Sequence, residues 1–278
     1  MAFNKSDLYP PTTVISRGFT IVEIMIVLAA SSLIGMIGLI ALSGRLDSTN
    51  LQITSNNFTI IMNQTITDNL SSFLNGYSKL YCMGSNSGQP ATLSSTPFSD
   101  LIANPGCIFL GTVVQFDPNS KPGEYVKYPV VGNQVFTQVS GPEPVQSLLE
   151  AYPEPVDNSA TVDLSQTLNI GDNITVSSLK ANGNNVGAIA FILSNLSHSL
   201  SSYDINNNLS SGNAVENLYY VDNISLGDPV ATDLQGHLMA ASSAQICLDE
   251  GGQKSVLVTI SGSQNLNVTT TNKAGDTC

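Results

Sequence analysis

The sequence predicts an α+β fold, in which a long N-terminal α-helix packs on a mainly antiparallel β-sheet head. An apolar run of 24 residues starts at Phe19 and contains one charge, Glu23. Apolar residues then recur at steps of three and four as far as Tyr77, with no proline in the stretch, which indicates that the helix continues. After Cys107, short β-branched runs alternate with Gly, Asn and Pro, which is typical of strands joined by turns.

The composition excludes several classes of protein. The chain has 278 residues, a formal net charge of −12 and a pI near 4.2, and only 11% of its residues are charged. Its polarity comes from Asn, Ser and Thr, so it is not a charge-driven disordered chain. Nine Lys and Arg residues cannot form a broad phosphate-binding stripe. Low charge with abundant Asn, Ser, Thr and Gly indicates an extracellular β-rich surface.

Four cysteines, Cys82, Cys107, Cys247 and Cys278, indicate two disulfides and therefore an oxidising compartment. None belongs to a CxxC pair, and neither histidine is close to a cysteine along the chain, so a zinc site is disfavoured. The simplest pairing is local, Cys82 with Cys107 and Cys247 with Cys278. Three connectivities are possible, and sequence does not choose among them.

The N-terminal apolar run is long enough to cross a bilayer as a helix. Lys5 and Arg17 precede it, and Arg45 follows it closely. By the positive-inside rule, the sequence predicts a single-pass protein of the cytoplasmic membrane with its head outside. Glu23 is the anomaly, because a carboxylate inside a membrane is costly unless it is paired or lies near the interface. It either assists the positive helix N-terminus or pairs with a cation.

Residues 17–23, RGFTIVE, followed by the long apolar helix, resemble the class III signal of type IV pilins and pseudopilins. The resemblance implies cleavage between Gly18 and Phe19 by a prepilin peptidase and N-methylation of Phe19. It also implies that Glu23 pairs with the Phe19 amine of an adjacent subunit during assembly. The implied partners are that peptidase, other pilin subunits through the N-terminal helix, a filament assembly ATPase, an inner-membrane platform protein and the membrane itself.

With this resemblance, the chain divides into four expected parts. They are a leader peptide, the membrane or filament-core half of the helix, its amphipathic half and an extracellular β-rich head, over residues 1–18, 19–46, 47–80 and 81–278. The mature chain is longer than typical major pilins, which favours a minor pilin or pseudopilin in a surface or envelope-spanning filament. The alternative is a membrane-anchored extracellular binding domain or enzyme that does not polymerise.

Local patterns predict the elements of the head. A first strand covers Cys107–Phe116, a hairpin turns across Gly132–Asn133, and a short helix covers Val145–Ala151. The C-terminal part is expected to be a meander with tight Gly turns. The strands of the hairpin are expected at Tyr125–Val130 and Gln134–Val139, and those of the meander at Ala244–Leu248, Ser255–Ser261 and Asn265–Thr270. Further strands or short turns are expected at Thr161–Ile170, Ile174–Leu179, Val186–Leu193, Asn217–Asp222 and Pro229–Met239.

No catalytic motif is present, so the chain is not expected to be an enzyme. His198 and His237 lie in no Gly-x-Ser-x-Gly, His-Glu-x-x-His or phosphate-loop context, and we interpret them as loop residues.

No cofactor or metal is expected. Residues 204–208 resemble the start of a calcium loop, but Leu209 replaces the turn glycine and Glu216 falls one place too far along. An Asn-rich loop is the preferred interpretation.

Nucleic-acid binding is disfavoured by the acidic charge. The one place for a contact with DNA would be formed by Lys121 and Lys127, with Tyr125 and Tyr128 beside them.

Overall fold

The computed structural model describes residues 20–70, 81–83, 92–94, 107–133, 136–137, 141–142, 148–155, 165–171, 173–193, 199–200, 216–251, 254–262, 265–273 and 278, with side chains from Gly38 to Ser48 and at some strand ends not described. The chain divides into two compact units, Met1–Asp47 and Ser48–Cys278. Each unit is described separately below.

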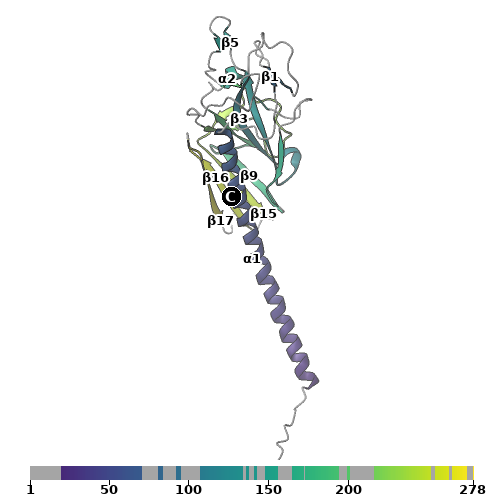
Figure 1. Ribbon diagram of the computed structural model, residues 1–278. Helices are drawn as coiled ribbons and strands as arrows, with labels where there is room; N and C mark the ends of the chain where they lie inside the picture. The colour runs from purple at the N-terminus through teal and green to yellow at the C-terminus, as the bar shows by residue number, and fades with distance from the viewer. Residues whose placement is uncertain are drawn as a thin grey trace, which may run out of the picture. The chain divides into compact units, whose positions relative to one another are not determined.

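Helix α1 spans Ile21–Leu70 (Figure 1). No proline interrupts it, and Thr20 precedes its first turn. In the second unit, one face of α1 is buried and carries apolar residues at helical spacing, Leu51, Phe58, Met62 and Ile66. Thr and Ser hydroxyls along α1 donate to the carbonyls three or four residues earlier, as Thr65 does to Ile61 at 2.9 Å. These polar side chains therefore satisfy their own hydrogen bonds within the helix.

Two antiparallel sheets make up most of the second unit (Figure 1). The five-stranded sheet has the order β10 (Asn184–Asn185), β9 (Ile174–Ala181), β15 (Ser243–Glu250), β16 (Lys254–Ser261) and β17 (Asn267–Lys273). Strands β15, β16 and β17 form the expected C-terminal meander, and the last of them pairs with β16 over all seven residues.

The eight-stranded sheet has the order β14 (Leu238–Ala240), β13 (Glu216–Val221), β11 (Ala188–Leu193), β3 (Cys107–Phe116), β4 (Glu124–Asn133) and β7 (Glu154–Pro155); β12 (Ser199–Leu200) pairs with β3, and β8 (Gln166–Asn169) pairs with β4. Two further pairs are β1 (Tyr81–Met83) with β2 (Thr92–Ser94), and β5 (Phe136–Thr137) with β6 (Gly141–Pro142). The remaining elements are the 3-10 turn Pro118–Ser120 and the short helix α2, Leu148–Ala151.

Two hydrophobic clusters form the core. The first joins α1 to residues of both sheets, and Phe58 lies at its centre, with ring centroids 6.0 Å from Phe116 and 5.8 Å from Tyr125. The second is built around Leu110, Tyr128 and Ile192 and contains no residue of α1. Strands therefore supply most of the buried surface.

The predicted α+β class has to be corrected to a β-rich fold. Among the described residues there are two helices, α1 and α2, whereas strands β1 to β17 form the sheets and supply most residues of both hydrophobic clusters. The physical reason is that α1 adds only four buried apolar side chains to the first cluster and none to the second.

The predicted transmembrane segment over residues 19–46, with the expected place in a cytoplasmic membrane, is also overturned. No helix in the described part of the chain combines the length and apolar character needed to cross a bilayer.

The predicted hairpin across Gly132–Asn133 is wrong. Gly132 and Asn133 are not a hairpin turn but lie inside β4, opposite Ile108 and Cys107 of β3. A Cβ at Gly132 would lie 2.6 Å from the carbonyl oxygen of Ala151, so glycine is needed there for close packing rather than for a turn. Pro229–Met239, expected to form a strand or short turns, is mostly a loop with a turn before β14, and only its end belongs to that strand.

Candidate functional site

The N-terminal end of α1 is held by a reciprocal pair of hydrogen bonds. The backbone N–H of Thr20 donates to Glu23 Oε2 over 3.4 Å, and the N–H of Glu23 donates to Thr20 Oγ1 over 3.3 Å. This is a capping box, in which an N-cap Thr and a Glu three residues later each satisfy a backbone donor of the first turn. Glu23 therefore has a role within its own chain.

Thr20 was not singled out by the sequence analysis, although the pattern that identifies it is present. Thr20-Ile-Val-Glu23 fits the Ser/Thr-x-x-Glu signature of a helix start. A carboxylate in the first turn also lies at the positive end of the helix macrodipole, where a negative charge stabilises the helix.

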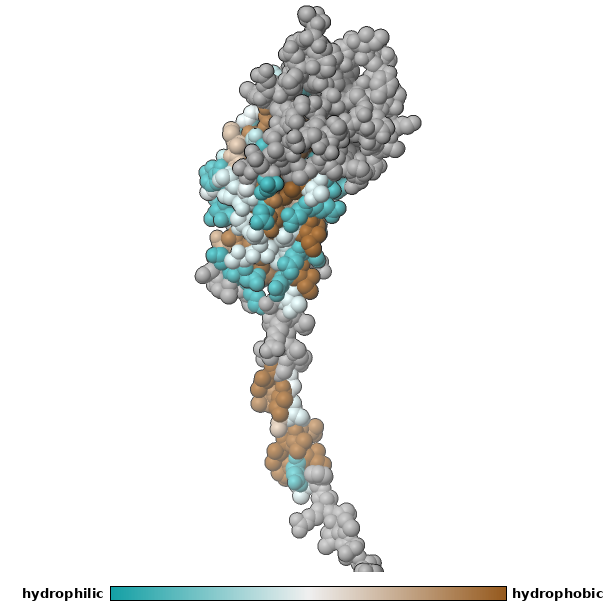
Figure 2. All heavy atoms as spheres, turned by 60° about the vertical axis from the view of Figure 1, so that its left-hand side comes forward, coloured by the Kyte–Doolittle hydropathy of each residue, from teal (hydrophilic) through white to brown (hydrophobic). Residues whose placement is uncertain are grey.

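Behind this cap lies an apolar segment of α1, which we define as residues 21–37. Its large hydrophobic side chains are all exposed, from 50% at Ile24 to 78% at Ile21. They are Ile21, Val22, Ile24, Met25, Ile26, Val27, Leu28, Leu33, Ile34, Met36 and Ile37. Figure 2 shows the brown, hydrophobic surface of this part of the helix. A helix that is hydrophobic on all sides must be covered by something, because each such side chain left in water forgoes about 1.5–3 kcal/mol.

The two serines of the apolar segment form hydrogen bonds within the helix. Ser31 Oγ donates to the carbonyl oxygen of Leu28 at 3.1 Å, and Ser32 Oγ donates to that of Ala29 at 2.9 Å. Their hydroxyl protons are thus satisfied by the helix itself. Glu23 is the one charged side chain in the segment.

The predicted cleavage and methylation positions, Gly18 and Phe19, lie outside the described residues. Thr20, the residue that follows them, is the first whose placement the structure describes. Of the predicted N-terminal site residues, the structure therefore places Glu23 and adds Thr20 beside it.

The structure describes the side chains of one predicted cysteine pair and not those of the other. Cys247 in β15 and Cys278 form a disulfide with a Cα–Cα distance of 5.8 Å, which is the local pairing that the sequence analysis gave as simplest. Cys82 lies in β1 and Cys107 begins β3, but their side chains are not among those described.

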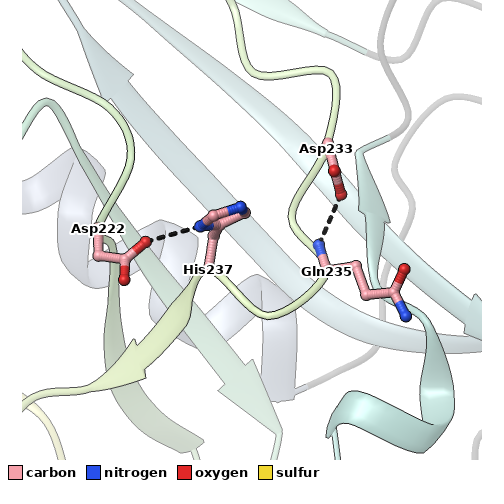
Figure 3. Close-up of polar contacts among 4 residues, drawn as sticks. All are labelled: Asp222, Asp233, Gln235 and His237. Carbon is pink, nitrogen blue, oxygen red and sulfur yellow. Dashed lines mark hydrogen bonds and ion pairs between the residues drawn. The ribbon is translucent and has the colours of Figure 1, made fainter.

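His237 belongs to a loop and pairs with an acid. Its Nδ1 lies 2.8 Å from Asp222 Oδ1 (Figure 3). The backbone N–H of Asp222 also donates to the carbonyl oxygen of His237 at 3.1 Å. These contacts join the two ends of the loop between β13 and β14. In the same loop Asp233 Oδ1 accepts from the N–H of Gln235 at 2.9 Å. The pair thus closes a loop, which agrees with the interpretation of His237 as a loop residue; His198 lies outside the described residues.

The residues considered for a DNA contact are engaged elsewhere. Lys121 Nζ lies 3.4 Å from Glu124 Oε2, and Lys127 Nζ donates to Thr65 Oγ1 of α1 at 3.4 Å. Burial holds the pKa of Lys127 below its usual value, and the nearby Asp68 carboxylate offsets part of that effect. Tyr125 and Tyr128 are fully buried and cannot stack on bases.

The possible calcium loop, residues 204–208, lies outside the described residues, as does Leu209, and the side chain of Glu216 is not described. Within the parts of the chain that the structure does describe, no group of three or more His, Cys, Asp or Glu side chains is placed to hold a metal ion.

Comparison with known proteins adds no relative. No protein-family model, no curated protein and no solved structure matches the chain.

Proposed function

We propose that the chain is a type IV pilin-like subunit that assembles into a filament through the apolar segment of α1. The observation that carries the proposal is the capped helix start at Thr20 and Glu23, followed by side chains that are apolar on every side and exposed. A partner that binds the apolar segment would contact apolar side chains and one carboxylate, that of Glu23. The matching partner is another helix of the same kind, in a second subunit.

The resemblance of residues 17–23 supports the same proposal. In it, a prepilin peptidase cuts after Gly18, Phe19 becomes the N-methylated first residue, and a filament assembly ATPase and platform protein drive polymerisation. Glu23 then lies close in sequence to the new amine, so both halves of an intersubunit charge pair are present at one end of the helix. The length of the mature chain favours a minor pilin or pseudopilin over a major subunit.

Paired substitutions in α1 test the proposal. Ile34 is 70% exposed in the apolar segment, and Ile60 is 61% exposed in the part of α1 that belongs to the second unit. Neither side chain is part of the buried core, so Ile34→Glu and Ile60→Glu should both leave the fold intact. In the native host, we expect Ile34→Glu to abolish incorporation into sheared filaments because a carboxylate would be buried among apolar helices. Ile60→Glu should retain incorporation.

Equal incorporation of the two variants, with both proteins folded and produced at wild-type levels, would contradict assembly through the apolar segment. Filament-free cells that still display the protein at the surface would favour the non-polymerising binding domain or enzyme instead.

A further inference from the structure

Strand β17 presents a regular, exposed edge. It is the last strand of the five-stranded sheet, and no described strand pairs with its outer side. All seven residues pair with β16, from Lys273 opposite Ser255 to Asn267 opposite Ser261, without a register shift. Six of the seven are exposed, and Val268 is buried. Every second residue of such an edge directs its N–H and C=O groups outward, which makes the edge a template for another strand.

The chemistry of β17 does little to prevent such pairing. Natural edges are protected by proline, bulges, charges or short length. β17 has the sequence NVTTTNK and carries one charge, Lys273, at its end. Residues 268–271 are all β-branched, which suits them to a pleated strand.

The charge distribution favours a second copy at this edge. Residues 254–273, which form the β16–β17 hairpin, contain two lysines and no Asp or Glu, although the whole chain has a net charge of −12. Two such acidic chains repel one another over most of their sequence, and this acid-free hairpin is a place where they can approach with little repulsion.

The opposite edge of the sheet is different. Two-residue β10 covers the end of β9 at Lys180 and Ala181. Next to it, a cavity of about 300 Å³ is lined by Ser177 and Leu179 of β9, and by Ser225 and Leu226 of the loop after β13. Head-to-tail pairing of β17 with β9 would have to accommodate this loop, whereas pairing of β17 with itself would not.

We propose that β17 pairs antiparallel with β17 of a second copy, with a two-fold axis at Thr270. This register places Thr270 opposite Thr270, Thr269 opposite Thr271, and Lys273 opposite Asn267. It creates three Thr–Thr cross-strand pairs, which are favourable in sheets, and no directly opposed like charges. The two Lys273 residues lie at opposite ends of the ladder, about 20 Å apart, beyond the range of unscreened repulsion at physiological salt. Two five-stranded sheets then become one of ten strands.

This pairing is independent of filament assembly, because it uses the sheet and not the apolar segment. Single cysteines in β17 of the purified full chain, held in a detergent that covers the apolar segment, test it. Opposed residues in an antiparallel pair have Cα atoms about 4.5–5.5 Å apart, within disulfide range. We expect Thr270→Cys to form a cross-linked dimer on mild oxidation. Peptide mapping should show that the new disulfide joins position 270 of one copy to position 270 of the other.

The matched controls use the neighbouring position. Thr269→Cys alone places its two thiols two residues out of register, with Cα atoms about 8 Å apart, so it should not cross-link to itself. A mixture of Thr269→Cys and Thr271→Cys should cross-link between the two variants. A Thr270→Cys chain that remains monomeric, or Thr269→Cys that cross-links as well as Thr270→Cys, would overturn the proposed register.

A second variant tests the contact without a cross-link. Thr270→Lys sets two ammonium groups opposite each other and should raise the dissociation constant of the dimer at least about threefold in sedimentation experiments. Thr232→Lys, an exposed position in the loop between β13 and β14, is the control and should leave it unchanged. Equal dissociation constants for the Thr270→Lys variant and wild type would contradict the proposal, as would β17 cross-links to another protein or to β9.

Discussion

Thr20 and Glu23 cap the start of α1 reciprocally, each side-chain oxygen accepting a hydrogen bond from the other residue's backbone N–H, at 3.3 Å and 3.4 Å. The carboxylate that the sequence presented as an anomaly in an apolar run thus has a partner in its own chain. In a filament the same carboxylate would also face the amine of a processed neighbour. Cap and charge are separable, because glutamine can serve in a capping box and carries no charge.

Glu23→Gln should therefore leave the helix start intact and reduce filament incorporation by more than about tenfold, since an unpaired buried amine is costly. Cleavage after Gly18 should be unaffected. N-terminal sequencing measures processing, and the yield of sheared filaments measures assembly. Glu23→Ala, which removes the cap as well, should also weaken amide protection over residues 21–24. Wild-type assembly of the Gln variant would show that the charge has no role, and loss of cleavage would place Glu23 in peptidase recognition.

The disulfide between Cys247 and Cys278 ties the C-terminal residue to β15 across a sequence separation of 31. Cys247→Ser should lower the free energy of unfolding by about 3–4 kcal/mol, because the unfolded chain regains the entropy of the open loop. Urea unfolding measures the change. Cys278→Ser should have the same effect, and combining the two substitutions should add nothing. Unequal or additive losses would mean that Cys247 or Cys278 has another partner.

Tyr125 is fully buried between α1 and the sheets, and its hydroxyl has no hydrogen-bond partner. Tyr125→Phe keeps the ring contacts with Phe58 and Phe116 and should stabilise the fold by about 1 kcal/mol. Burial also raises the pKa of Tyr125 to about 12. The unfolded chain, with a tyrosine pKa near 10, then loses its proton first as pH rises, so stability should fall between about pH 10 and 12. Tyr125→Phe should weaken this alkaline loss; destabilisation at pH 7 would reveal a buried water on the hydroxyl.

Gly111 lies at the bulge in β3, with φ +148°, and a Cβ there would clash with the carbonyl oxygen of Phe191. Gly111→Ala should therefore lower the free energy of unfolding by about 3 kcal/mol, the upper end of the usual range for overpacking, because backbone atoms of β11 would have to move. Gly183, with φ +85° and open space around its Cβ position, is the control and should lose about 1 kcal/mol from backbone strain alone. Thermal unfolding compares the two, and equal losses would contradict the steric explanation.

Local patterns predicted the elements whose contacts are close in sequence. The meander of β15, β16 and β17 could be predicted because short turns join strands that pair with each other. Gly132 misled the prediction because its glycine is required by Ala151, a tertiary neighbour that no local pattern reveals. The α+β class failed for a related reason: periodicity identified α1, but it could not show that one of the two cores is built without it.

The site was predictable to a similar extent. Glu23 stood out by its charge, and its partner Thr20 could have been found from the capping-box spacing. The exposure of the apolar segment could not be predicted from the sequence. An apolar run has the same sequence pattern whether it is covered by its own chain, by lipid or by a second subunit. Lys127 was considered for a contact with phosphate, but its ammonium group donates a hydrogen bond to Thr65 of α1. No pattern in the sequence indicates this tertiary contact.

The mature N-terminus tests the central claim most directly. Mass spectrometry of the protein isolated from its native host should find a first residue at Phe19, N-methylated, with the preceding residues 1–18 removed. A chain that still begins at Met1, in cells whose other pilin-like proteins are processed, would contradict the assignment as a pilin-like subunit.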